Sequence, residues 1–204
     1  MFLLFDHVRL RTDSILAYRW QEYQVTQSKG FFKKEKISKY RIELYPSFLS
    51  EQHYVEEFED EKKARERLGE IKKICSTFIL IDEYYVNPKN ILAYQLKEFR
   101  GESSLHFYTT LGESVYFVEN FETVSDGLQR YRELSSWLPN FIKFSELQLN
   151  KDLVVSYELK NTGEDYVLSF YTVANSVEGW TETFQSRLQA EDRLRAVEGI
   201  LGVK

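Results

Sequence analysis

Three histidines and one cysteine are the side chains best suited to acid–base or nucleophilic chemistry in this chain. His7 and His53 fall on predicted strands, and His106 falls on a later strand, outside its apolar pattern. We therefore expect all three to be solvated rather than catalytic or metal-binding. Cys75 lies on an apolar helical stripe, which predicts a small buried side chain rather than a reactive thiolate. The sequence thus indicates no catalytic residue, no metal ligand and no cofactor.

A run of acidic side chains offers carboxylates for a divalent cation: Glu56, Glu57, Glu59, Asp60 and Glu61. The run lacks the alternating Asp/Asn and Gly pattern of a calcium loop. It spans the end of a predicted strand and the first turn of a predicted helix, where negative charge complements the helix dipole. The favoured interpretation is therefore helix-start electrostatics.

The stretch SKGFFKKEKISKYR combines basic and aromatic residues and is the best candidate for contact with a partner. It overlaps a basic hairpin insertion at about residues 24–39, and the candidate contact residues are Phe31, Phe32, Lys33, Lys34 and Lys36. Rings interleaved with lysines suit single-stranded nucleic acid, an anionic membrane surface or an acidic protein. The alternative is a longer hairpin whose phenylalanines pack on a neighbouring unit and whose lysines are solvated.

Composition narrows the class of protein. The net charge is −5 and the pI is near 5.4, so nothing marks the whole chain as a nucleic-acid binder. A lone cysteine excludes a disulfide-stapled secreted scaffold. The apolar run before Asp6 is too short for a signal-peptide core, and no later run reaches the length of a membrane span. We expect a cytoplasmic protein, and we recognise no family motif.

Three related stretches organise the chain, beginning at Phe2, Phe78 and Phe141. Residues 141–203 align with 78–140 without a gap, and 16 of the 63 pairs are identical. The first copy aligns with the second at an offset of 76 in its front half and 63 in its back half, and the difference of 13 is the insertion. Units of this size are marginal alone, so we expect them to pack as one body. The predicted repeats are residues 1–76, 77–140 and 141–204.

Within each copy the periodicity changes from strand-like to helical. Alternating runs such as HVRLR, YRIELY and HYVEEF predict strands, and a stripe with a period of 3.6 residues follows them. Each helix begins after a residue suited to N-capping: Asp60, Thr123 and Ser186. Small residues on the stripes suit close packing of helix on sheet: Ala64, Gly127 and Ala190. We predict an α+β fold of three tandem ββββα repeats, with largely antiparallel sheets and one helix per repeat packed on one face.

Two sets of recurrent residues are expected to be structural. Asn87 and Asn150 recur at the first turn of the second and third copies, where an Asx-turn explains them. The other set is expected to fill equivalent core positions and consists of Tyr18, Tyr94 and Tyr157.

These observations favour a non-enzymatic protein-binding or scaffold protein built from internal repeats, because no polar set recurs as a repeated catalytic site would require. The expected partner is another protein or a second copy of the chain. One alternative is binding of nucleic acid or an anionic membrane surface through the basic insertion, which strong salt dependence would reveal. Another is an enzyme with a site between repeats, using His7, His53 or carboxylates near Glu56, which a pocket of converging titratable groups would reveal.

Overall fold

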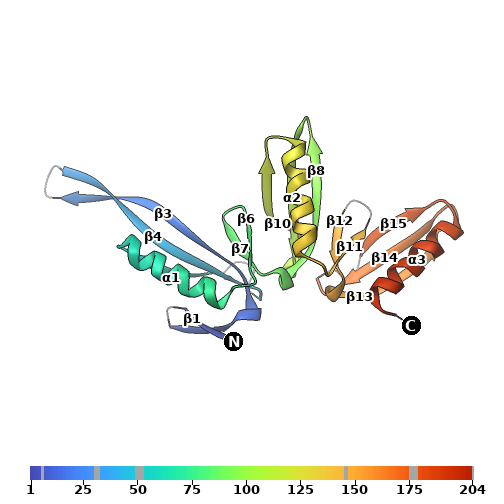
Figure 1. Cartoon of the computed structure of the whole chain (residues 1–204), viewed down its shortest axis with the longest axis horizontal. Coiled ribbons are helices and arrows are strands. Elements are labelled where there is room, and N and C mark those ends of the chain that lie inside the picture. The colour runs from blue at the N-terminus through green and yellow to red at the C-terminus, as the bar shows by residue number, and fades with distance from the viewer. Residues whose placement is uncertain (6, 30–32, 49–52, 145–146, 175–178, 204) are drawn as a thin grey trace. The chain divides into compact units, whose positions relative to one another are not determined.

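The computed structural model describes residues 1–204 except residues 6, 30–32, 49–52, 145–146, 175–178 and 204, and except the side chains of residues 28, 29, 33 and 113–115 (Figure 1). The described chain is an α+β protein with mostly antiparallel sheets and three α-helices. It divides into two compact units, residues 1–90 and 91–204. Each unit has its own hydrophobic core.

The first unit contains a five-stranded antiparallel sheet, a separate hairpin and one helix. In chain order its elements are β1 (Phe2–Phe5), β2 (Val8–Arg11), η1 (Thr12–Ser14), β3 (Ile15–Lys29), β4 (Lys33–Pro46), β5 (Tyr54–Phe58), α1 (Glu61–Ile74), β6 (Ile79–Ile81), β7 (Tyr84–Val86) and η2 (Pro88–Asn90). The sheet order is β5-β4-β3-β7-β6, and β1 pairs with β2. Phe5 from the hairpin, Tyr18 and Ile42 from the sheet, and Ile71 from α1 meet in one core.

The second unit contains two antiparallel sheets and two helices. Its elements are β8 (Ile91–Phe99), β9 (Glu102–Thr109), β10 (Gly112–Phe121), α2 (Val124–Trp137), β11 (Phe141–Phe144), β12 (Leu147–Asn150), η3 (Lys151–Leu153), β13 (Val154–Asn161), β14 (Tyr166–Thr172), β15 (Trp180–Phe184) and α3 (Arg187–Leu201). The sheet orders are β10-β9-β8-β12-β11 and β13-β14-β15. Leu92 from the first sheet, Phe170 from the second and Val197 from α3 belong to one buried cluster.

All three helices begin at their predicted caps. The side-chain oxygens of Asp60, Thr123 and Ser186 each accept a hydrogen bond from a backbone N–H three residues later, at 3.0, 3.2 and 3.3 Å. The donors are Lys63, Asp126 and Gln189. Because Asp60 is the cap of α1, the helix-start interpretation of that carboxylate is confirmed.

The predicted apolar stripes face the interior. Their fully buried members are Ala64 and Ile71 on α1, Gly127 and Leu134 on α2, and Ala190 and Val197 on α3. Cys75 ends the stripe of α1 and is 3% exposed, and burial raises the pKa of its thiol to about 11. The prediction of an inert buried cysteine is confirmed.

The structure corrects the number of strands and the placement of two histidines. In the described ranges each helix follows five strands of its own copy instead of the predicted four, and the additional ones are β1, β6 and β11. Each of these has at most four residues, too few to show a period of two on its own. His7 lies in the turn between β1 and β2, and His53 lies just before β5, so both strand predictions were wrong. Both side chains are exposed.

In both units a short hairpin docks against the edge of a long strand. In the first unit β7 lies beside β3, with Val86 opposite Ala17. In the second unit β12 lies beside β8 in the same register, with Leu149 opposite Ala93. The hairpins β6–β7 and β11–β12 thereby extend three-stranded sheets to five strands.

Asparagine side chains fasten these docked hairpins. Asn87 donates from Nδ2 to the carbonyl of Ile15 at 3.2 Å, and Asn150 donates in the same way to the carbonyl of Ile91 at 3.0 Å. The Oδ1 atom of each asparagine accepts a backbone N–H two residues later. The predicted Asx-turns are therefore present, but the contact with the neighbouring strand was not foreseen.

Replacing Asn150 by alanine is expected to cost about 1.5 kcal/mol of stability, because it leaves the buried Ile91 carbonyl without its side-chain donor. Hydrogen exchange of the β8 amides measures this loss. The matched control is Asn140→Ala, which removes an exposed amide that donates to Asp152 in the same turn. Equal losses of stability in the two variants would show that the buried hydrogen bond from Asn150 to Ile91 contributes no more than the exposed one.

Candidate binding site

Strands β3 and β4 form a two-stranded arm that leaves the sheet of the first unit and reaches beyond α1 (Figure 1). Their ladder continues to Lys29 opposite Lys33. However, β5 pairs with β4 only over residues 40–44, and β7 pairs with β3 only over residues 17–19. We define the arm as residues 23–29 and 33–39. Among the described residues, neither outer edge of the arm has a neighbouring strand.

The two faces of this long hairpin differ because successive side chains of a strand alternate between them. Tyr18, Trp20 and Ile42 lie on the face that belongs to the core with α1. The guanidinium of Arg65 on α1 lies 5.2 Å from the ring of Trp20 on this side. The opposite face, which we call the open face, consists of Arg19, Gln21, Tyr23, Val25, Ile37, Lys39, Arg41 and Glu43.

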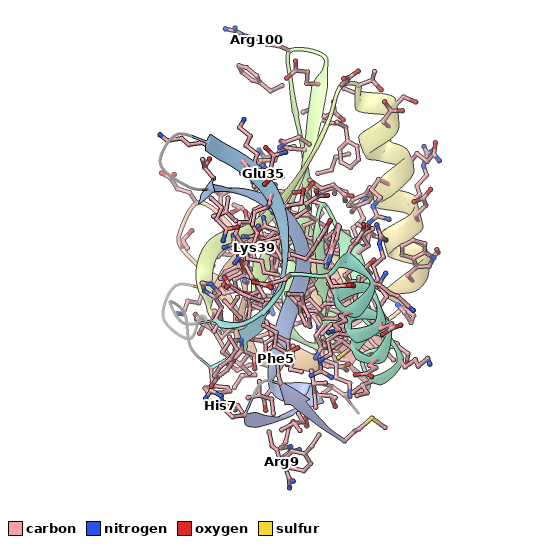
Figure 2. The ribbon with its side chains drawn as sticks, turned by 90° about the vertical axis from the view of Figure 1, so that its left-hand side faces the viewer. Phe5, His7, Arg9, Glu35, Lys39 and Arg100 are labelled. Atoms are coloured by element: carbon pink, nitrogen blue, oxygen red, sulfur yellow. The ribbon has the colours of Figure 1, made fainter. Side chains whose placement is uncertain are left out.

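Two of the predicted contact residues are exposed cations on the arm, Lys34 and Lys36. Lys33 begins β4, but its side chain lies outside the described residues. Phe31 and Phe32 also lie outside the described residues. Glu35 and Lys39 lie along the same strand, as Figure 2 shows.

A groove of about 680 Å³ runs along the arm. Val25 and Ile37 lie opposite each other in the ladder and give it an apolar lining. Lys36 and Lys39 add positive charge, and Glu59 approaches Lys39 to 3.8 Å at the end nearer the sheet. The groove therefore suits an extended segment with an apolar side chain flanked by carboxylates.

A charged cluster follows the groove toward the sheet on the open face. Its centre is Glu43, whose side chain is only 2% exposed. Arg19 and Arg41 approach the Glu43 carboxylate through their Nε atoms at 2.5 and 2.8 Å, and the hydroxyl of Tyr45 donates to it at 2.5 Å. The guanidinium of Arg19 also lies 4.9 Å from the ring centre of Tyr84. Every carboxylate oxygen of Glu43 thus has a charged or hydroxyl partner.

The cluster keeps Glu43 ionised. Burial alone would raise the pKa of its carboxyl, but the hydrogen bond from Tyr45 and the ion pairs with Arg19 and Arg41 outweigh burial and hold the pKa below its usual value. Burial and the hydrogen bond to Glu43 raise the pKa of the Tyr45 hydroxyl. The carboxylate of Glu43 therefore keeps its negative charge near neutral pH and stays paired with Arg19.

This cluster was not predicted from the sequence, although one alignment position bears on it. Glu43, His106 and Ser169 occupy aligned positions, all polar and all within a strand. Of the three, only His106 was expected to be solvated, and Glu43 and Ser169 are buried. His106 is half-buried instead of solvated: its Nε2 lies 2.9 Å from the hydroxyl of Ser104, and burial, followed by the charge of Lys97, lowers its pKa.

Ion pairs between strand and helix also account for part of the acidic run. Glu56 on β5 pairs with Arg67 on α1 at 2.8 Å. Two further pairs have the same spacing of 11 residues: Glu119 with Arg130 at 3.0 Å, and Glu182 with Arg193 at 2.8 Å. Within the described part of the chain, no group of three His, Cys, Asp or Glu side chains is placed to hold a metal. None of its described helices is long and apolar enough to cross a membrane.

Comparisons with protein-family models, curated proteins and solved structures give no match to this chain. The chemistry of the arm and of the open face therefore carries the functional inference.

Proposed function

We propose that this protein is a non-enzymatic binding protein, built from three tandem units, whose arm holds an extended acidic segment of a partner protein. The observation that carries the proposal is the arm itself. Two strands continue side by side to Lys29 and Lys33, well past the sheet that anchors them. Backbone N–H and C=O groups on a free strand edge are available to an added strand.

The charge of the arm favours an acidic ligand. Lys34 and Lys36 are exposed, and the only acidic side chain within residues 33–39 is Glu35. Val25 and Ile37 add apolar contact area within the groove. Strand addition gives affinity through main-chain hydrogen bonds, whereas the flanking lysines select for carboxylates.

Three tandem units are supported by features that recur at matching positions in the chain. The capping residues Asp60, Thr123 and Ser186 are each 63 residues apart, and each is followed by a helix of similar length. The strand-to-helix ion pairs recur with the same offset. Among the residues that the structure describes, only the first copy has such an arm, which is why we assign partner binding to that copy.

Fluorescence anisotropy of a labelled peptide that alternates glutamate and valine tests this function. The full chain is expected to bind it, and Lys34→Glu/Lys36→Glu is expected to weaken binding about tenfold, equivalent to about 1.4 kcal/mol. The matched control is Lys62→Glu/Lys63→Glu, which makes the same charge change on the exposed side of α1. This control is expected to bind like the native chain.

Three competing ligands make the outcome specific: a peptide alternating lysine and valine, a single-stranded oligothymidine, and vesicles containing phosphatidylserine. Preference for the acidic peptide supports the proposal. Tighter binding of the oligonucleotide or the vesicles, lost in the arm variant, would instead assign the arm to nucleic acid or to an anionic surface. Equal weakening in the control variant would show only a general charge effect.

A further inference from the structure

Two strands, β2 and β13, each have an edge that pairs with no other strand among the described residues. Strand β2 is the counterpart of β7 and β12, yet among the described residues it pairs only with β1. Strand β13 is the counterpart of β3 and β8, yet among the described residues it pairs only with β14. Within the described part of the chain, the β1–β2 hairpin is therefore docked on no strand, and β13 has no docked hairpin.

Side chains on β13 are more exposed than their counterparts on β3 and β8. Leu16 on β3 and Leu92 on β8 are fully buried beside their docked hairpins. Val155, the aligned residue on β13, is 66% exposed. Tyr157 packs against the core but is only half-buried, whereas its counterparts Tyr18 and Tyr94 are buried, so the expected core position is confirmed only in part for the third copy.

The same aromatic contact is made at both docked hairpins. Phe78 lies 5.8 Å from Tyr18, and Phe141 lies 5.3 Å from Tyr94, measured between ring centres. The aligned residue of the first hairpin is Phe2, which is 64% exposed. In the part of the chain that the structure describes, Phe2 thus lacks the tyrosine contact that Phe78 and Phe141 make. Tyr157 likewise lacks, within the same residues, the contact with a hairpin phenylalanine that Tyr18 and Tyr94 make.

The free edges of β2 and β13 also carry complementary charges. If β2 followed the register of β12 on β8, Arg9 would lie opposite Tyr157, and Val8 opposite Glu158. The Tyr157 hydroxyl donates to Glu198 at 3.1 Å, so an arginine at this place meets acidic groups. Arg9 is exposed and projects away from its hairpin, while Phe5 faces inward (Figure 2).

From these surfaces we infer that a second copy of this chain docks its β1–β2 hairpin on β13, so that copies associate head to tail. The joint repeats the geometry of β7 on β3 and of β12 on β8. Head-to-tail contacts of this kind are heterologous, and they give open rows unless the rotation closes a ring. The inference uses the tandem-unit alignment of the proposed function but is independent of the ligand of the arm.

Sedimentation velocity of the native chain over a wide concentration range tests this association. We expect the average mass to rise with concentration without stopping at a dimer. A head variant, Phe2→Ser/Arg9→Ser, and a tail variant, Val155→Lys/Ser156→Lys, each change only exposed residues and are each expected to stay monomeric. An equal mixture of the two variants retains one intact head and one intact tail, and is therefore expected to form a one-to-one dimer and nothing larger.

The controls separate this inference from the proposed function. Lys34→Glu/Lys36→Glu should assemble like the native chain, and the head and tail variants should bind the acidic peptide like the native chain. Circular dichroism melting establishes that each variant is folded. A native chain that stays monomeric, a variant that assembles alone, or a mixture that grows beyond a dimer would each overturn head-to-tail docking.

Discussion

Replacing Arg19 by methionine is expected to lower the free energy of unfolding of the first unit by about 3 kcal/mol, because it removes a cation from a buried carboxylate. The Glu43 side chain is 2% exposed, so water cannot take the place of the guanidinium. Arg41 and Tyr45 remain as partners of Glu43, which keeps the loss at the lower end of the range for broken buried ion pairs. Hydrogen exchange of the β3 and β4 amides measures the effect.

A second variant tests the mechanism of that loss. In Arg19→Met/Glu43→Met both charges of the pair are absent, and replacing a buried ion pair by apolar side chains of similar volume is often neutral. The double variant is therefore expected to be more stable than Arg19→Met alone. Losses that simply add would show that the two side chains are not coupled.

The Arg19→Met effect should also depend on pH. The folded pKa of Glu43 lies below its ordinary value of 4.5, so its stabilisation is complete above that value and is lost as pH falls through the lower folded pKa. The stability difference between the native chain and Arg19→Met is therefore constant near neutral pH and shrinks below pH 4.5. A difference that grows on acidification would contradict the assignment of the shift to these ion pairs.

Features that depend on neighbouring residues in the sequence were predictable. Asp60 indicated the start of α1, because an N-cap residue accepts a hydrogen bond from a backbone N–H only three residues away. The buried stripe with Ala64 and Ile71 followed from helical periodicity for the same reason. The basic stretch at Lys34 and Lys36 was equally visible, because a cluster of like charges needs no tertiary information.

Features that depend on pairing between distant residues were not predictable in this way. The hairpin β6–β7 docks on β3 across about seventy residues of sequence, and the three residues of β6 give no periodic signal of their own. The burial of Glu43 was not predictable, because it depends on Arg19, which is 24 residues away on the neighbouring strand. Whether a polar side chain of a strand is buried or solvated can be decided only when its ion-pair partner on another strand is known.

Replacing Gly127 by alanine is expected to destabilise the second unit by about 2.5 kcal/mol, although alanine is the better helix former. A Cβ atom at this position would lie 2.2 Å from the hydroxyl oxygen of Ser103 and 3.1 Å from Leu96 Cδ1. Ser103 cannot turn away without loss, because its hydroxyl donates at 2.8 Å to the carbonyl of Thr123, the cap of α2. The predicted close approach of α2 to its sheet thus requires glycine.

Two glycines on the other helices are matched controls for this substitution. A Cβ at Gly69 on α1 or at Gly199 on α3 would meet nothing within 4 Å. Gly69→Ala and Gly199→Ala are therefore expected to stabilise the protein by up to about 1 kcal/mol through helix propensity alone. Opposite signs for Gly127→Ala and the two controls, measured by guanidinium unfolding, would separate the steric effect from the propensity effect.

Compensation at Ser103 gives the decisive comparison. Ser103→Gly alone removes a buried hydroxyl that bonds to the cap of α2, so it is expected to destabilise the second unit. In Ser103→Gly/Gly127→Ala the alanine methyl group enters the space that the serine side chain vacates, so the double variant should lose less than the sum of the two single losses. Additive losses would show that the destabilisation by Gly127→Ala comes from the contact with Leu96. The Ser103 side chain would then not set the distance between α2 and β9.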